Sequence, residues 1–299
     1  MISSSNNRAK QTVERAQPWL GTLVSIRCEG LGEREAHRAI EAAFHEIAMV
    51  HRLMSFHDPK SELSRLHRAR AGEPVHVHPY TWEVLRQATA LSVSTDGCFD
   101  VTVGAELVEW ELLPRQAVSA GDRRGSWRDI ELLPENRVVF HRPLCVDLGG
   151  IAKGFAVDLA TECLSAHGAR HTVVNAGGDI RVQGIEAEPI QLSAESTDAL
   201  PVLELTDGSI ASSCGDLQRR SRLHGSHVDG RSRKPAPTDR FVSVVAERCI
   251  IADALTKVVM ARGRESAPAL REFGASAWLH DAGQAWQCLG PLEEQSAAA

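Results

Sequence analysis

Apolar residues recur along this chain at two different spacings, and these predict a mixture of helices and strands. From about Glu33 to Leu53 they return every three or four positions, which is the spacing of one helical face. A similar stripe predicts a second helix over Thr81–Ser94, with Thr81 as its N-cap. The two stripes consist of Ala36, Ile40, Ala43, Phe44, Ile47 and Val50, and of Val84, Leu85, Ala88 and Leu91.

Shorter apolar runs bounded by turn residues predict strands. They lie at 20–26, 144–148 and 172–175, with hairpins over 127–141 and 277–287 and a strand-rich stretch over 183–250. Glycines are placed to end two more helices and a short third one. These helices are predicted over 151–167 and 252–262 and just before Gly274. Strands mixed with helices favour an α+β fold over a doubly wound parallel sheet.

The length of 299 residues suits one large domain or two closely packed halves. Hydrophobic residues make up 43% and charged residues 24%, which is typical of a globular chain. We predict a disordered N-terminus over 1–18, a single domain over 19–290 and a frayed C-terminus over 291–299.

Charge and cysteine content exclude several classes of function. The net charge is −6 without a strong Lys/Arg run, which argues against nucleic acid as a partner. No stretch is apolar for long enough to span a bilayer, and no export signal is recognisable, so we predict no membrane partner and a cytoplasmic location. Seven cysteines without a CxxC pair argue against a disulfide framework or a zinc site.

Two glycine pairs are the strongest candidates for ligand chemistry. Gly149 and Gly150 lie between a predicted strand and a predicted helix, where free N–H groups and Lys153 could bind phosphate. One such pair is more often only a tight turn. A second pair, Gly177 and Gly178, follows the next strand and again has an acidic neighbour, Asp179. Together they favour a phosphate or nucleotide site, without specifying the nucleotide.

Segments along most of the chain resemble the motifs of the ApbE-type FAD:protein FMN transferases. DLGGIAKG (147–154) and NAGGDI (175–180) are similar to the two signature segments of that family. The others follow in family order: LGTLVSI (20–26), MSFHDPKSELSRLH (54–67), GCFDVTVG (97–104), SSCGD (212–216), SHVDGRSRKP (226–235) and ADAL (252–255). The resemblance covers residues 19 to 280 or so and implies an ApbE-like (T-fold-like) α+β fold of antiparallel sheets with packed helices.

The resemblance also implies a reaction and its participants. FAD is the substrate, and a divalent ion, commonly Mg²⁺, lies beside its pyrophosphate. A Thr or Ser hydroxyl of a client flavoprotein attacks the phosphorus on the FMN side, and AMP leaves. Such phosphoryl transfer needs neutralised phosphate charge, an in-line hydroxyl and a base near that hydroxyl.

Carried onto this sequence, the resemblance assigns site residues. The metal ligands would be the Ala152 carbonyl, the Asp253 carboxylate and the residue at Lys257, although a first-turn Asp is by itself more often a helix-terminal charge. His227 would activate the client hydroxyl together with Asp253, and Asp229 would orient His227 or contact the ligand. The FAD-binding residues would be Leu20, His57, Cys98, Phe99, Asp100, Gly149, Gly150, Lys153, Phe155, Gly178, Asp179, Val228 and Asp229. Either Phe could instead be a core residue.

Several positions depart from the family pattern. Lys257 stands where the family has a metal-binding threonine, and Thr256 is one position early. A protonated Lys cannot bind a metal, although its charge could partly replace one. His57 replaces a tyrosine, and Cys214 replaces a serine.

The segment that contains His227 also differs. It is one residue shorter than in the family between His227 and Asp229, with Gly230 for proline and Arg233 for glycine. Four interpretations therefore stay open: an FMN transferase, an FAD pyrophosphatase that uses water, a flavin-binding protein without turnover, and a protein for another nucleotide.

Overall fold

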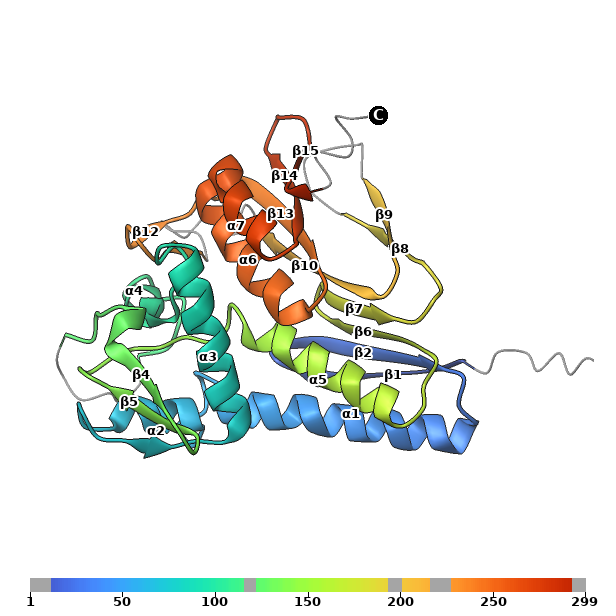
Figure 1. Ribbon diagram of the computed structural model, residues 1–299, viewed down its shortest axis with the longest axis horizontal. Helices are drawn as coiled ribbons and strands as arrows, with labels where there is room; N and C mark the ends of the chain where they lie inside the picture. The colour runs from blue at the N-terminus through green and yellow to red at the C-terminus, as the bar shows by residue number, and fades with distance from the viewer. Residues whose placement is uncertain (1–11, 116–121, 193–200, 216–226, 292–299) are drawn as a thin grey trace, which may run out of the picture.

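The computed structural model describes residues 12–115, 122–192, 201–215 and 227–291. Its main element is an eight-stranded sheet in which every neighbouring pair is antiparallel (Figure 1). In spatial order the strands are β1 (Thr12–Trp19), β2 (Thr22–Glu29), β6 (His171–Ala176), β7 (Asp179–Gln183), β10 (Gly208–Cys214), β13 (Arg240–Ala246), β14 (Ser276–Asp281) and β15 (Gln287–Leu289).

Three helices cover one face of this sheet: α1 (Glu33–Met54), α5 (Ala152–Ala166) and α6 (Cys249–Arg262). Side chains alternate along each strand, so Val242 and Val244 of β13 join the core under the helices, while Phe241 and Val245 join a second core on the opposite face. A hairpin of β8 (Glu188–Gln191) and β9 (Val202–Leu205) contributes to that second core.

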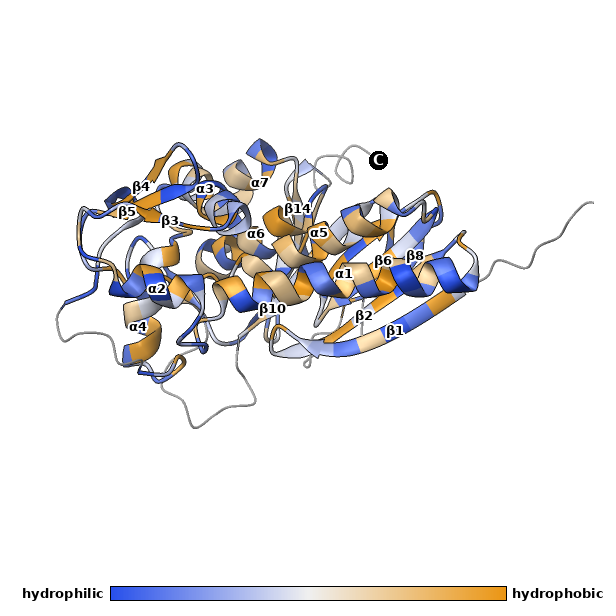
Figure 2. Cartoon of the chain, turned by 90° about the horizontal axis from the view of Figure 1, so that it is seen from below, coloured by the Kyte–Doolittle hydropathy of each residue, from blue (hydrophilic) through white to orange (hydrophobic). Residues whose placement is uncertain are grey.

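The middle helix, α5, buries nine of its 15 residues. Figure 2 shows it mostly in the hydrophobic colour, whereas α1 in front of it carries hydrophilic bands. This difference follows from position, because α5 packs against α1, α6 and the sheet, and a helix enclosed in this way keeps little polar surface. The residue types of α5 are therefore set by burial on several sides.

A smaller part lies beyond the C-terminal end of α1 (Figure 1). It contains a three-stranded sheet and short helices, which are β3 (Val75–His76), β5 (Arg137–Phe140) and β4 (Ile130–Leu133) in spatial order, with α2 (Glu62–Arg68), α3 (Pro79–Ser94) and α4 (Gly104–Glu109). The hairpin of β11 (Val228–Asp229) and β12 (Lys234–Pro235) and helix α7 (Ala267–Glu272) complete the strands and α-helices of the described residues.

The α+β fold of antiparallel sheets is confirmed, as are most of the predicted helices and hairpins. The predicted N-cap of α3 is wrong. His78 caps this helix and Pro79 begins it, while the Thr81 hydroxyl donates to Glu62 Oε2 at 2.7 Å. Proline favours the first helical position because it has no N–H to leave unpaired, and this moved the start of the helix two residues back.

The predicted strand at 144–148 is also wrong, although the segment is largely buried. Its backbone bonds to loops and to a side chain: the Val146 N–H donates to His67 Nε2 at 3.0 Å and the Asp147 N–H to the Val101 carbonyl at 2.7 Å. A buried apolar run needs partners for its backbone groups, but these need not be strands.

The N-terminal boundary differs from the prediction as well. Residues from Thr12 onward form β1, paired along its length with β2, so the predicted disorder is wrong for 12–18. Residues 1–11 lie outside the described residues, as do 292–299 at the other end. All seven cysteines are free thiols. Within the described ranges, no helix combines the length and apolar composition needed to cross a bilayer.

Helices α5 and α6 come together at Gly154. A Cβ there would lie 2.3 Å from the Cys249 carbonyl oxygen, and the Gly154 N–H donates to Asp253 Oδ2 at 3.1 Å. Only glycine permits this approach, because any side chain would overlap the backbone of α6. The contact fixes the first turn of α5 against α6.

We expect Gly154→Ala to lower the free energy of unfolding by about 1–3 kcal/mol, because the added methyl forces the two helices apart. Helix propensity alone would give the opposite sign, a gain of up to about 1 kcal/mol. Chemical denaturation measures the difference. Glu162→Ala, at an exposed site on the same helix, serves as the control and should change stability by less than about 0.5 kcal/mol. A more stable Gly154→Ala protein would contradict the close contact.

Candidate functional site

A cavity of about 970 Å³ opens where the three large helices meet the smaller part. Sites for small molecules and cofactors are usually of this size. Its walls come from distant segments: the end of α1, the loops 55–58, 98–103 and 147–150, the start of α5, residues 107–113, the end of β10, residues 227–228 and Lys257 of α6. The fold therefore assembles the cavity from both halves of the chain.

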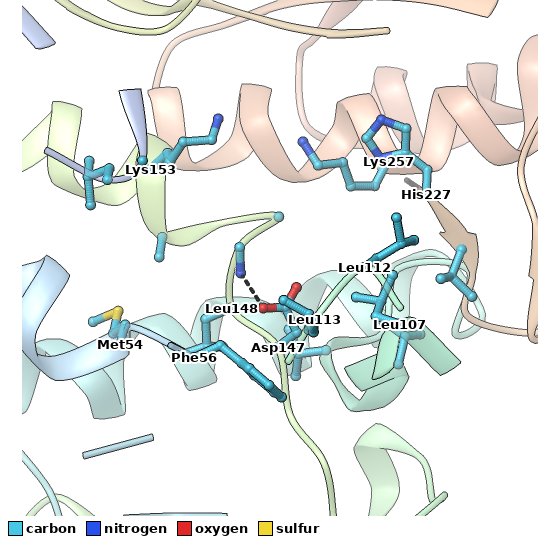
Figure 3. Close-up of a pocket in the computed structure, with 18 of the residues that line it drawn as sticks. Met54, Phe56, Leu107, Leu112, Leu113, Asp147, Leu148, Lys153, His227 and Lys257 are labelled. Atoms are coloured by element: carbon cyan, nitrogen blue, oxygen red, sulfur yellow. Dashed lines mark hydrogen bonds between the residues drawn. The ribbon is translucent and has the colours of Figure 1, made fainter. Parts of the chain in front are cut away.

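One side of the cavity is apolar and the other is charged (Figure 3). The apolar side includes Met54, Phe56, Leu107, Leu112, Leu113 and Leu148. Lys153, Lys257 and His227 project from the opposite side in the view of Figure 3, with Asp147 between the two groups. A ligand with a flat apolar ring at one end and a phosphate at the other would match this distribution.

The first glycine turn borders the charged side. Gly149 and Gly150 line the cavity just before α5, and the Gly149 N–H donates to Asp147 Oδ1 at 3.2 Å. Burial raises the pKa of Asp147, while the hydrogen bond from Gly149 lowers it. In this structure the carboxylate of Asp147 thus takes one of the N–H groups that we predicted for a phosphate.

The second glycine turn lies behind this wall. Asp179 at its end forms an ion pair with Lys153, and the Gly178 N–H donates to Asn175 Oδ1 at 2.9 Å. Gly178 and Asp179 do not line the cavity. The structure therefore connects the two predicted turns through the ammonium of Lys153, which lines the cavity and pairs with Asp179.

Two buried carboxylates stand behind two lysines at this wall. Asp179 and Asp253 are 1% and 0% exposed, and Lys257 Nζ lies 2.8 Å from Asp253 Oδ1. Burial raises the pKa of Asp179 to about 6, helped by the charge of Asp253. Burial acts in the same direction on Asp253, but Lys153 and Lys257 outweigh it and lower the pKa of that group.

The pKa of Lys153 is likewise set by burial against neighbouring charges, with the signs reversed because Lys153 is a cation. Burial disfavours its ammonium, but Asp253 and Asp179 outweigh burial and raise its pKa above the ordinary value. Both lysines also border the cavity. The carboxylates thus hold two positive charges at the edge of the cavity.

His227 borders the cavity next to these lysines. Burial is the main reason that its pKa falls to about 3, and the charge of Lys257 adds to it. The imidazole is therefore neutral near pH 7, and a pKa this low makes it only a weak base while the cavity holds no ligand. The carboxylate of Asp229 does not orient it: Asp229 accepts from the Arg231 N–H at 3.0 Å and the Ser232 hydroxyl at 2.9 Å.

Most of the predicted site residues lie at the cavity, and five do not. The residues at the cavity are Leu20, His57, Cys98, Phe99, Asp100, Gly149, Gly150, Ala152, Lys153, His227, Val228 and Lys257. Phe155, Gly178, Asp179, Asp229 and Asp253 lie away from it. Phe155 belongs to the core, where its ring meets Tyr80 with centroids 5.6 Å apart.

Sequence reasoning missed the apolar wall. Leu107, Leu112 and Leu113 follow the 97–104 segment, and Met54 begins the 54–67 segment. Their closeness to two recognised segments was the available signal, but leucines and a methionine are the ordinary residues of any core. Ser213, next to Cys214 at the end of β10, was missed too.

Asp100 supports the wall through a network of hydrogen bonds. Its Oδ1 accepts from the Thr102 N–H and hydroxyl, both at 2.8 Å, and its Oδ2 accepts from Arg233 at 2.7 Å. Burial raises the pKa of Asp100, although the charge of Arg233 opposes it. Arg233, which stands where the family has glycine, has a φ of 58°. The backbone there keeps the conformation that suits glycine, while the side chain pairs with Asp100.

A divalent ion does not fit the residues present. Among the described residues, no three of His, Cys, Asp and Glu gather where they could hold a metal. Both carboxylate oxygens of Asp253 are occupied, one by Lys257 at 2.8 Å and the other by the Gly154 N–H at 3.1 Å. Asp216, from the SSCGD segment, lies outside the described residues. Of the metal ligands implied by the resemblance, only the Ala152 carbonyl and the Asp253 carboxylate supply oxygens among the described residues, and Asp253 is already paired with Lys257.

We expect Arg233→Gly to destabilise the protein by about 2–4 kcal/mol. Removing one partner of a buried ion pair costs about 3–5 kcal/mol, and glycine at a positive φ recovers only about 1 kcal/mol. Denaturant unfolding measures the sum. Arg231→Ala, which breaks the exposed pair with Asp96, is the matched control and should cost less than about 1 kcal/mol. An Arg233→Gly protein of unchanged stability would show that the Asp100 network carries little energy.

We expect His227 to make the protein less stable as the pH falls below 6.5. The unfolded chain takes up a proton near its ordinary pKa of 6.5, whereas the folded protein does so only near 3, so stability is lost between these values. From pH 7 to pH 5 the loss is at most about 2 kcal/mol.

Denaturant unfolding at both pH values, repeated on His227→Gln, isolates this contribution. The variant should lose less stability than the wild type over this range. His37→Gln, at an exposed site on α1, is the control and should follow the wild type. Equal losses in His227→Gln and the wild type would contradict the low pKa.

Comparison with known proteins agrees with the resemblance. The model of the ApbE family matches residues 20–278. An FAD:protein FMN transferase of Vibrio cholerae is 30% identical over 298 residues, which cover 91% of this chain and 88% of that protein. One of Rhodobacter capsulatus is 28% identical over 83% of this chain and 51% of its own length. The crystal structure of the ApbE protein of Thermotoga maritima superposes with a TM-score of 0.81, 25% identity, and coverage of 95% of this chain and 99% of that one. This chain belongs to the ApbE family.

Proposed function

We propose that this protein transfers FMN from FAD to a Thr or Ser hydroxyl of a client protein and releases AMP. The observation that carries the proposal is the divided cavity: an apolar wall on one side, and two lysines beside a glycine turn on the other. Relatives that match most of the chain are named FAD:protein FMN transferases, and that name supplies the substrate.

The apolar wall suits the flavin ring. Leu107, Leu112 and Leu113 face the cavity from one side and Phe56 and Met54 from another (Figure 3). Apolar contact of this kind is the main source of affinity in cofactor sites, while a few polar groups set the orientation. His57 and Phe99 lie at the same cavity and can contact the ring edges or the adenine.

The charged wall suits the diphosphate. Lys153 and Lys257 supply positive charge close to the backbone of Gly149 and Gly150 at the start of α5, where a helix N-terminus favours an anion. As the client hydroxyl attacks the FMN phosphorus, the bond from that phosphorus to the bridging oxygen breaks and AMP leaves with that oxygen. Fixed positive charge stabilises the negative charge on the phosphoryl oxygens in this step.

His227 receives the proton of the client hydroxyl. It is neutral before the ligand binds, because burial and Lys257 keep its pKa to about 3. A diphosphate placed between the lysines adds negative charge, which raises the pKa of the imidazole and makes it a better base. No divalent ion enters this proposal, because Lys257 already neutralises Asp253.

We expect incubation with FAD and a protein extract of the source cell to give a covalently flavinylated band and an equal amount of AMP. Flavin fluorescence in a denaturing gel detects the first product, and chromatography the second. FAD alone should raise the melting temperature, since a ligand of the native state stabilises it. His227→Gln should lower the rate by about 10²–10⁴-fold, the usual contribution of a general base.

Three other outcomes would overturn the proposal, and each indicates a different function. FMN and AMP without a client protein would show an FAD pyrophosphatase. FAD binding with no AMP in any extract would show a flavin-binding protein without turnover. If FAD leaves the melting temperature unchanged, FAD is not a ligand of this protein, and every function that uses a flavin is excluded.

A further inference from the structure

The ammonium of Lys257 lies in a pocket of three oxygens. Its Nζ is 2.8 Å from Asp253 Oδ1, 2.9 Å from Thr256 Oγ1 and 3.1 Å from Ser213 Oγ. An ammonium has three N–H donors, so these partners occupy all of them. Oxygen atoms from α6 and from the end of β10 thus hold a cation that belongs to the chain.

The hydrogen bonds around the ammonium fit only one arrangement. The Thr256 hydroxyl lies 2.7 Å from the Asp253 carbonyl, which can only accept, so Thr256 gives its one proton there. Ser213, 2.8 Å from Thr256, must therefore donate to Thr256. Both hydroxyls then turn a lone pair towards Lys257. The pocket is arranged for a positive charge.

Two sequence features fix the lysine in this place. Lys257 lies one helical turn after Asp253, on the same face of α6, so its side chain reaches back to the carboxylate. Its stem runs past Gly150, where an added Cβ would lie 3.3 Å from both Cγ and Cε of Lys257. The missing side chain at Gly150 leaves room for the lysine beside the phosphate-binding turn.

The buried carboxylate of Asp253 needs a positive partner, and Lys257 fills the place that a metal ion could take. Asp253 is fully buried, and a buried carboxylate needs a positive partner. A divalent ion could be that partner only if Lys257 left, because both would compete for Asp253 Oδ1. Magnesium also needs oxygens at about 2.0–2.1 Å in a near-octahedral set. The three oxygens here surround an ammonium at hydrogen-bonding distances instead.

We propose that the ammonium of Lys257 takes the place of a divalent cation, so that this protein binds the diphosphate of FAD without a metal. The inference rests on the proposed function only for the identity of the ligand. With Lys153, which also lines the cavity, the chain places two ammonium groups of its own beside the diphosphate, each paired with a buried carboxylate. Asp253 then acts as a positioning residue for Lys257.

Metal binding can be measured without turnover. We expect titration of the protein with Mn²⁺, followed by the EPR signal of the free ion, to show no tight site, with FAD or without it. Lys257→Thr frees Asp253 and adds a hydroxyl, so this variant should bind Mn²⁺. The double variant Lys257→Thr, Asp253→Asn should lose that gain, which would show that the new site uses Asp253.

The second measurement is FAD affinity in EDTA. The affinity of the wild type should be the same with EDTA and with Mg²⁺, whereas Lys257→Met, which keeps the length but removes the charge, should bind about 10-fold more weakly or worse. Lys234→Met, on the exposed strand β12, is the matched control and should bind FAD as the wild type does.

The outcomes separate this inference from the proposed function. Tight Mn²⁺ binding by the wild type, or loss of FAD affinity in EDTA, would overturn the role of Lys257, whatever the activity. Equal FAD affinity in EDTA together with no AMP release would overturn the transferase and leave the role of Lys257 intact. If the variants fail to fold, the titration of the wild type with Mn²⁺ still shows whether a metal binds. If FAD does not bind at all, both the transferase and this inference are overturned.

Discussion

The buried carboxylate of Asp253 determines how the rest of the site is arranged. It is fully enclosed, and it accepts one hydrogen bond from the Gly154 N–H and another from Lys257. The first bond ties the start of α5 to α6 at the point where only glycine allows the two backbones to approach. The second holds a positive charge at the cavity. Because a buried charge must be compensated, the close packing of the helices and the charge of the cavity depend on one group.

Periodicity predicted the elements that this site needs, but not all of their edges. The stripe of α1 was recognisable because one face meets the core, and α5 and α6 were bounded by glycines. The segment 144–148 was mistaken for a strand because its apolar run is typical of one. Its backbone partners, His67 and Val101, come from far along the chain, and no local pattern specifies such contacts. Likewise, β1 exists because β2 pairs with it, although its own sequence is mostly polar.

The candidate site could be predicted where residue type and spacing carry the chemistry. Gly149, Lys153 and His227 belong to segments with a phosphate-binding or proton-accepting composition, and all three line the cavity. The sequence does not show whether a helical side chain points into a cavity or into the core. Phe155 was therefore predicted to contact the ligand, although its ring packs in the core against Tyr80. The apolar wall from Leu107 to Leu113 was missed, because only the three-dimensional structure shows which leucines face a cavity.

The two departures from the family pattern at Arg233 and Lys257 follow one physical rule. Each places a long basic side chain beside a buried carboxylate, Arg233 at Asp100 and Lys257 at Asp253. Arg233 keeps a positive φ to do so, a conformation that costs a non-glycine residue about 1–2 kcal/mol. A carboxylate that is ion-paired with a basic side chain of the same protein binds an external cation only weakly. The ammonium of Lys257 that borders the cavity then belongs to the protein and is in place before any ligand arrives.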